Sequence, residues 1–205
     1  MTTSATPTPK RATRGSYAKT EARRRQIIEA ATIEFATRGY TGGSLREIAK
    51  TLSLSFTGLM HHFPSKELLL EAVLEHADQL AASEFERRRL ADGLLEAILW
   101  LAEYNLGHPQ LLRLLAVLSA EASSPGHPAH EWFTTRYTNL RQAFTAHIRE
   151  DQAKGLIDTS CNAELAAASI VASWDGTQLQ WLIDPSFDMM PAFRHSVRTA
   201  IHGVG

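Results

Sequence analysis

Cationic and hydroxyl side chains are concentrated in residues 44–66. Arginine can donate two hydrogen bonds to a guanine edge, and lysine, serine and threonine suit phosphate oxygens. The same segment has the spacing of two short helices joined by a turn, the pattern in which the second helix enters the DNA major groove. The sequence therefore predicts a contact with double-stranded DNA. The candidate DNA-binding residues are Ser44, Arg46, Ser55, Phe56, Thr57, Gly58, Met60, His61, His62 and Lys66.

Three of these residues have a second interpretation. Arg46 contacts a base, or it is a solvated charge beside Lys50. Phe56 packs on a thymine methyl group, or it is buried in the small core of the motif. His62 contacts phosphate, or it packs on the helix that follows.

The elements that position these side chains are short helices with clear end signals. We expect a first helix from Thr20 to Arg38, ended by a glycine, and two short helices at 45–52 and 56–63. Ser44 and Ser55 are expected to cap the two short helices, with Glu47 reaching back to Ser44 in a capping box.

The rest of the chain is predicted to be helical, with no sustained alternation typical of strands. The fold class is all-α with about nine helices, and the later ones are expected at 66–90, 92–107, 109–122, 129–154, 162–183 and 190–202. The predicted domains are a disordered basic arm (1–19), a helix-turn-helix DNA-binding domain (20–66) and a helical effector-binding and dimerisation domain (67–205).

The net charge of −1 hides a strong asymmetry along the chain. Residues 1–66 carry eleven Lys/Arg and four Glu, a net charge of +7, which leaves ten Lys/Arg and eighteen Asp/Glu, or −8, for the remaining residues. A basic end suits the phosphate backbone of DNA. The alternative is a basic tail on an ordinary domain.

Several function classes find little support in the sequence. Cys161 is the only cysteine, which excludes an intrachain disulfide and a cysteine-based metal site. His127 and His130 have no third metal ligand near them in sequence, and no common catalytic motif is present, so we expect no enzyme, metal or cofactor. The absence of a signal peptide or a long apolar run predicts a cytoplasmic protein without a membrane partner.

Residues 20–70 closely resemble the DNA-binding domain of the tetracycline-repressor (TetR) family of bacterial regulators. The matching positions are Phe35, Gly39, Tyr40, Ser44, Arg46, Glu47, Ile48, Ala49, His61, His62, Phe63, Ser65, Lys66, Glu67 and Leu68. Two positions depart from the family pattern: Met60 stands where a tyrosine is usual, and Gly43 where a threonine is usual. Both family residues typically contact DNA, so the basic arm is expected to supply part of the phosphate contact.

The body is expected to hold an effector pocket, because aromatic residues are spread over helices that should face one another. The candidate ligand-binding residues are Trp100, Tyr104, Trp132, Phe133, Tyr137, Trp174, Asp175 and Gln178, with His130 and Arg136 as further polar candidates. The alternative is that these aromatic side chains form an ordinary core.

A helix-turn-helix protein that recognises operator DNA needs a second subunit related to it by twofold symmetry. Small and apolar residues at helical spacing in 162–183 favour a close helix contact, and the candidate dimerisation residues are Leu165, Ala168, Ala172, Gly176 and Leu179. The resemblance implies that the last two helices form the dimer interface; the alternative is an ordinary buried helix.

The predicted function is a homodimeric, DNA-binding transcriptional regulator, a repressor released from operator DNA by a small-molecule effector. A ligand-independent activator or architectural protein is the alternative. An enzyme that acts on small molecules is a distant third.

Overall fold

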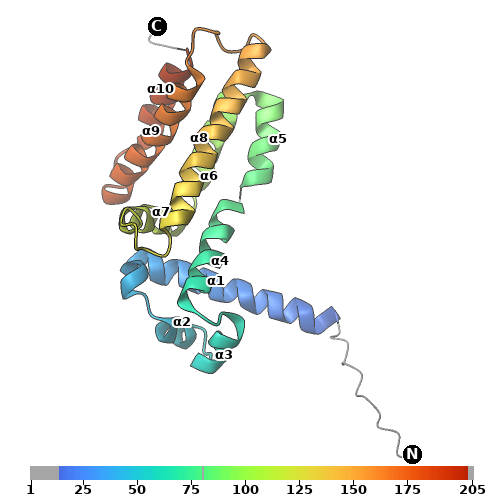
Figure 1. The fold of residues 1–205 in the computed structure, drawn as a ribbon, viewed down its shortest axis with the longest axis vertical. Coiled ribbons are helices and arrows are strands. Elements are labelled where there is room, and N and C mark those ends of the chain that lie inside the picture. The colour runs from blue at the N-terminus through green and yellow to red at the C-terminus, as the bar shows by residue number, and fades with distance from the viewer. Residues whose placement is uncertain (1–13, 80, 203–205) are drawn as a thin grey trace, which may run out of the picture.

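The computed structural model describes residues 14–79 and 81–202, and all regular secondary structure in these residues is helical (Figure 1). The all-α fold class is therefore confirmed. The helices are α1 (Arg14–Gly42), α2 (Leu45–Thr51), α3 (Phe56–His62), α4 (Lys66–Gln79), α5 (Ala82–Asp92), α6 (Leu94–Leu106), α7 (Pro109–Glu121), α8 (His130–Ala153), α9 (Ala163–Ile183) and α10 (Met189–His202).

Two expected helix boundaries were wrong. The first helix begins at Arg14, so residues 14–19 of the predicted arm are helical, while residues 1–13 of that arm lie outside the described residues. The helix expected over 66–90 is two helices, α4 and α5. Ala81 between them has φ −122° and ψ 0°, which is not an α-helical conformation. No Gly or Pro occurs in this stretch, so the sequence carried no signal for the break.

We call α1–α4 the head and α5–α10 the body. The head has a core built on the apolar stripe of α1, where Ile27 and Phe35 are fully buried. Ile48 of α2, Leu59 of α3 and Phe63 pack into the same cluster. Each short helix alone would be marginal in water, so this burial is what holds α2 and α3 in place.

The core of the head continues into the body. Leu114 and Leu118 of α7 and Phe133 of α8 belong to the same buried cluster as the head residues. Figure 1 shows α7 lying across the junction, next to α1, while α8, α9 and α10 run away from the head. The position of the head is therefore set by packing as well as by the connection through α4.

A second core fills the far part of the body. It joins α6, the last turns of α8, α9 and α10, with Leu99, Ile148 and Phe193 among its buried members. The helices of the second core also enclose the cavity described below.

Candidate nucleic-acid interface and body cavity

The turn between α2 and α3 is tight and locally determined. Ser53 takes a left-handed backbone conformation (φ 53°), and the N–H of Leu54 donates to the carbonyl of Ala49 over 2.8 Å. Ser55 then caps α3, since its Oγ accepts from the N–H of Gly58 over 3.0 Å. The expected cap at Ser55 is thus present, and it directs the first turn of α3 toward solvent.

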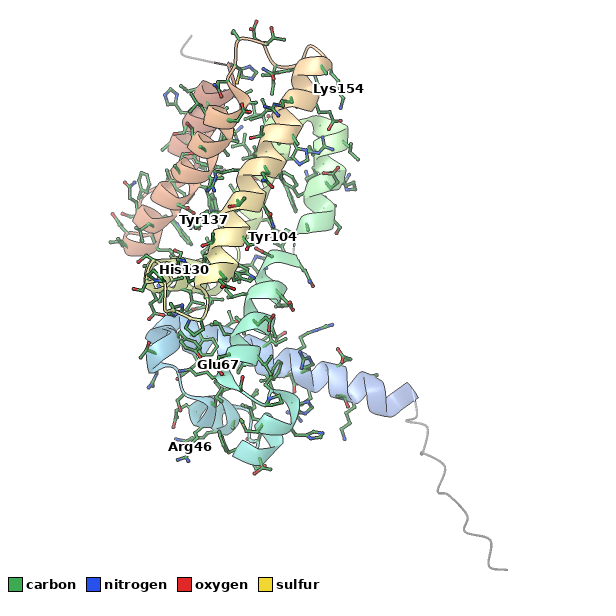
Figure 2. The ribbon with its side chains drawn as sticks, viewed as in Figure 1. Arg46, Glu67, Tyr104, His130, Tyr137 and Lys154 are labelled. Carbon is green, nitrogen blue, oxygen red and sulfur yellow. The ribbon has the colours of Figure 1, made fainter. Side chains whose placement is uncertain are left out.

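Phe56 and Arg46 lie together on the outer surface of the head. The side chain of Phe56 is 43% exposed, so it is not part of the small core. Arg46 is exposed, and its guanidinium carbon lies 5.6 Å from the centre of the Phe56 ring. Lys50 pairs with Glu47 (3.7 Å), and its side chain is exposed. Figure 2 shows Arg46 at the end of the molecule away from the body.

The remaining side chains of α3 differ in how far they are exposed to solvent. Thr57 and His61 are exposed, whereas Met60 is half-buried and packs against the head core. His62 is also half-buried, with its ring 5.7 Å from that of His61. Burial lowers the pKa of His62, and the positive charges of nearby residues lower it further. A neutral imidazole at this position can still donate one hydrogen bond to phosphate.

Arg24 of α1 reaches the end of α3, a contact that the sequence did not reveal. Its Nη1 donates to the carbonyl oxygen of His62 over 3.1 Å, and its guanidinium lies 4.2 Å from the centre of the Phe63 ring. The basic part of α1 therefore lies beside the recognition helix.

Lys66 has partners within the head. Its Nζ donates to the carbonyl of Thr41 (3.4 Å) and lies 4.6 Å from the centre of the Tyr40 ring. The hydroxyl of Tyr40 donates to Glu67 over 2.8 Å, and burial together with this bond raises the pKa of Tyr40. Lys66 thus stabilises the contact between α1 and α4 in addition to its candidate role at phosphate.

The cap of α2 differs from the expected capping box. Ser44 Oγ accepts from the N–H of Glu47 at 3.4 Å, as predicted, but the N–H of Ser44 donates to Glu34 of α1 over 3.0 Å. The reciprocal bond from Glu47 was wrong, because a carboxylate from another helix occupies that place.

Gly43 is explained by packing. A Cβ here would lie 2.6 Å from the Phe35 ring, and the N–H of Gly43 already donates to the carbonyl of Gly39. A threonine at position 43 would require Phe35 to move, so the departure from the family pattern follows from the packing of this head.

A cavity of about 80 Å³ lies between α6, α8, α9 and α10. Trp174 and Asp175, two of the predicted ligand-binding residues, line it. Its walls are mostly apolar, and its polar groups come from Asn105, Arg136 and Asp175. The apolar lining includes Ile98, Leu101, Phe144, Trp174 and Phe193. Asn105 and Phe193 were not predicted as lining residues. Phe193 does follow the helical spacing of the apolar residues of α10.

Tyr137 belongs to the surroundings of this cavity through Asp175. The two side chains share a hydrogen bond, and burial raises the pKa of both groups, that of Tyr137 to about 12. The bond from Tyr137 and the charge of Arg136 oppose the rise at Asp175 without cancelling it. Gln178, one turn further along α9, is buried, and its Oε1 has no hydrogen-bond partner among the described residues.

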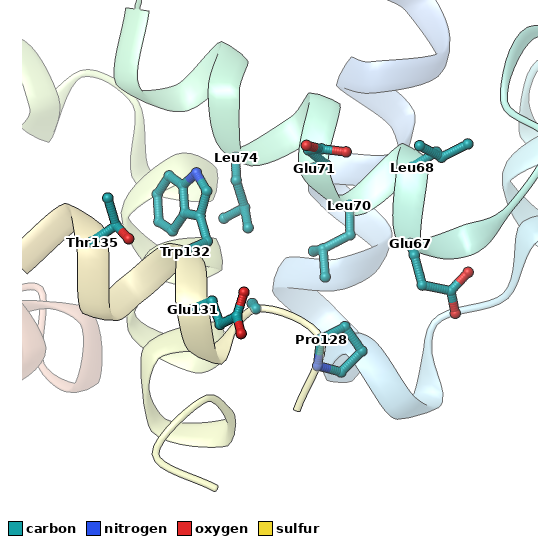
Figure 3. Close-up of a pocket in the computed structure, with 10 residues that line it drawn as sticks. Glu67, Leu68, Leu70, Glu71, Leu74, Pro128, Glu131, Trp132 and Thr135 are labelled. Atoms are coloured by element: carbon teal, nitrogen blue, oxygen red, sulfur yellow. The ribbon is translucent and has the colours of Figure 1, made fainter. Parts of the chain in front are cut away.

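The structure places the other predicted aromatic residues elsewhere. Trp100 stacks on Tyr104 (5.3 Å) and faces Arg88 of α5 (4.8 Å). Phe133 is buried in the head core, and Trp132 packs against that core beside an open groove of about 430 Å³ between α4 and the start of α8 (Figure 3). These four residues do not line the body cavity.

The candidate dimerisation residues form an exposed stripe on α9. Leu165 and Leu179 are 67% and 51% exposed, and Ala172 and Gly176 are also exposed, while Ala168 is half-buried. Ile183 extends the same stripe with 77% exposure. Exposed apolar side chains in line with small residues leave room for another helix to approach.

Comparisons with known proteins agree with this architecture. Residues 27–73 match the sequence model of the bacterial regulatory proteins of the tetR family. This chain belongs to the TetR family. It is a DNA-binding transcriptional regulator with a helix-turn-helix.

Individual relatives extend the likeness beyond the head. The transcriptional regulator UidR of Escherichia coli K12 is 25% identical over 148 residues, which cover 70% of this chain and 74% of UidR. The transcriptional repressor NicS of Pseudomonas putida is 33% identical over 98 residues, 45% of this chain and 46% of NicS. The structure of a SmeT–triclosan complex superposes with a TM-score of 0.75 at 16% identity, covering 87% of this chain and 90% of that one.

UidR and NicS are named as transcriptional regulators, not as enzymes. Within the described residues, no three His, Cys, Asp or Glu side chains are grouped so that they could hold a metal ion. No helix in the described part of the TetR-family chain is long and apolar enough to cross a membrane.

Proposed function

We propose that this TetR-family protein is a homodimeric repressor that leaves its operator when a small molecule binds in the body cavity. In this proposal residues 20–66 bind DNA, and residues 67–205 bind the effector and the second subunit. The observation that carries the proposal is the position of Arg136, which lines the cavity and also reaches α4. Its Nε donates to Asp78 near the end of α4 over 2.8 Å.

This geometry offers a route from the cavity to DNA. A ligand that displaces Arg136, or that shifts α8, changes the support of α4, and α4 connects α1–α3 to the body. The two recognition helices of a dimer must meet half-sites about 35 Å apart, so a change in the angle of each head weakens binding. Near-complete release requires that the ligand favour the released state by roughly 5.5 kcal/mol.

The exposed stripe of α9 supports the dimer. A lone subunit would leave Leu165, Leu179 and Ile183 in water, and burial of each such side chain contributes about 1.5–3 kcal/mol. The relatives support repression and binding of a small molecule, the other two parts of the proposal. NicS is named as a repressor, and SmeT has been solved with triclosan.

The experiment begins with selection of duplexes from a random-sequence pool by the full-length protein. Titration of a selected duplex should show two chains per site and an affinity that falls with salt, by a log–log slope of about −0.9 for each phosphate contacted. A panel of small molecules is then tested for release of the protein from the duplex.

Two outcomes of this experiment would contradict parts of the proposal. A slope near zero would contradict DNA binding through the basic end. Strong duplex binding that no compound in a broad panel reverses would favour the ligand-independent alternative.

A further inference from the structure

The body cavity is lined by one carboxylate, that of the half-buried Asp175, whose charge is not fully balanced. The polar groups in its lining are Asn105, Arg136 and Asp175. Arg136 is already engaged, because its Nε lies 2.8 Å from the carboxylate of Asp78 and its guanidinium lies 5.7 Å from the centre of the Trp132 ring. Asp78 therefore takes up much of the positive charge that Arg136 would otherwise offer to Asp175.

Asp175 receives a hydrogen bond from the neutral hydroxyl of Tyr137. Burial nevertheless raises the pKa of Asp175, so the surroundings do not fully compensate its negative charge. A half-buried carboxylate in this condition is stabilised by any cation that reaches it.

The walls next to Asp175 are aromatic. Trp174 precedes it on α9 and packs edge-on against Phe193, with ring centres 5.3 Å apart, and Phe144 lines the same space from α8. Aromatic faces attract alkylammonium groups, and the attraction is strongest where water is excluded. A carboxylate beside aromatic rings is the combination that recognises an organic cation.

We propose that the body cavity binds a small organic cation, an amine with apolar substituents, whose charge pairs with Asp175 and whose alkyl groups pack on Trp174, Phe144 and Phe193. This inference rests on the proposed ligand-binding role of the cavity and specifies the chemistry of the ligand. An anion would face Asp175 and would have to draw Arg136 away from Asp78. A neutral apolar molecule would cover the carboxylate of Asp175 without supplying a counter-charge.

The volume restricts the size of the cation. One water molecule needs about 10–15 Å³ of such space, so about 80 Å³ accommodates roughly five to eight non-hydrogen atoms. Tetramethylammonium fits this range, and tert-butanol and pivalate are a neutral and an anionic molecule of similar shape.

The test is calorimetric titration of the full-length protein with these three compounds at neutral pH. Tetramethylammonium should bind more tightly than tert-butanol and pivalate. Asp175→Asn should weaken tetramethylammonium binding by about thirty-fold or more, since loss of one partner of a buried charge pair costs about 2 kcal/mol or more and 1.4 kcal/mol is tenfold. Glu164→Gln, on the exposed part of the same helix, is the matched control and should bind like the wild type.

Three results would overturn the inference. Equal or tighter binding of tert-butanol or pivalate would show that the cavity does not select a cation, while the proposed ligand-binding role of the cavity would stand. Unchanged tetramethylammonium binding in Asp175→Asn would show that Asp175 is not the partner of the cation. Absence of binding by tetramethylammonium would also reject it. Duplex titration of the same samples reports separately whether the regulator itself is intact.

Discussion

The backbone N–H of Tyr40 donates a hydrogen bond to the carboxylate of Glu121 over 2.8 Å, between residues 81 positions apart in the chain. This bond joins the end of α1 in the head to the end of α7 in the body. The ring of Tyr40 also packs edge-on against His127, with centres 5.3 Å apart, in the segment that follows α7. The head is therefore attached to the body at a second point, far from α4.

Gly39 is required for this attachment, and Gly39→Ala is expected to destabilise the protein. Gly39 has φ 68° and ψ −179°, a region that is essentially restricted to glycine, and a Cβ would lie 2.0 Å from Glu121 Oε1. The backbone cost alone is about 1–3 kcal/mol. Chemical unfolding measures the loss, and Gly126→Ala, where a Cβ meets open space, is the control. Equal stability of both variants would contradict the prediction.

Arg46→Ala and Lys66→Ala should have different effects on DNA binding. Loss of an arginine–guanine contact costs about 1–3 kcal/mol at one base pair and relaxes preference there, whereas loss of a phosphate contact weakens all sequences alike. Titration of operator variants distinguishes the two, with Lys50→Ala as an exposed control. If Arg46→Ala reduces affinity equally for every variant, Arg46 does not read a base.

Met60→Tyr tests the departure from the family pattern on α3. A tyrosine hydroxyl that reaches phosphate contributes about 1.5–3 kcal/mol at most, and less in water, so binding to all DNA should strengthen. The competing outcome is that Met60, which is half-buried against the head core, also packs on Phe56 or a thymine methyl group, so that the larger ring clashes at the cognate site. Weaker binding to cognate DNA, with unchanged binding to random DNA, would make Met60 a reader of sequence.

Gly176→Leu should weaken the dimer. A Cβ at Gly176 meets nothing within 4 Å in the subunit, so the substitution has room and also raises helix propensity. Any loss of association must then come from contact with the second chain. Sedimentation velocity measures it, with Gly126→Leu in an exposed loop as the control. A dimer of unchanged strength would place the interface elsewhere.

Asp175→Asn should raise stability at neutral pH. Burial raises the pKa of Asp175 in the folded state above its ordinary value of 3.8, although Tyr137 and Arg136 oppose the rise. The folded state therefore holds a proton more readily than the unfolded state, and stability falls as pH rises from about 3.8 through the raised pKa. Asparagine removes this loss, so the variant should melt at a higher temperature at pH 7, and the difference should vanish at low pH.

Asp184→Asn supplies a control of opposite sign for that experiment. Hydrogen bonds from Ser186 lower the pKa of Asp184, so its contribution to stability is present above the ordinary pKa and is lost in acid. A lower melting temperature for Asp175→Asn at pH 7 would show that the hydrogen bond with Tyr137 outweighs burial.

The sequence predicted the features of the head that depend on neighbouring residues. Ser44 and Ser55 each cap a helix by accepting from an N–H three positions on, as expected, and this relation is readable from sequence alone. The bond from Glu34 to Ser44 and the contact of Arg24 with α3 were not predictable, because they depend on how separate helices pack.

The lining of the cavity was also predictable only in part. Trp174 and Asp175 were correctly placed on one helix, but the walls supplied by α6 and α10 depend on the relative rotation of three helices. Trp100 and Trp132 lie on predicted helices, as Trp174 does. Unlike Trp174, neither of them lines the cavity. Aromatic composition identifies the candidates and does not decide which face of each helix turns inward.

The two attachment points between head and body have a practical consequence for hybrid regulators. A graft that joins a foreign head to this body between α4 and α5 would preserve chain continuity but would lose the match between Gly39, Tyr40 and Glu121. Such a hybrid would still bind its DNA, but its response to the effector would be impaired. Exchange of α7 together with α1–α4 transfers both ends of that contact and makes a transferable recognition module.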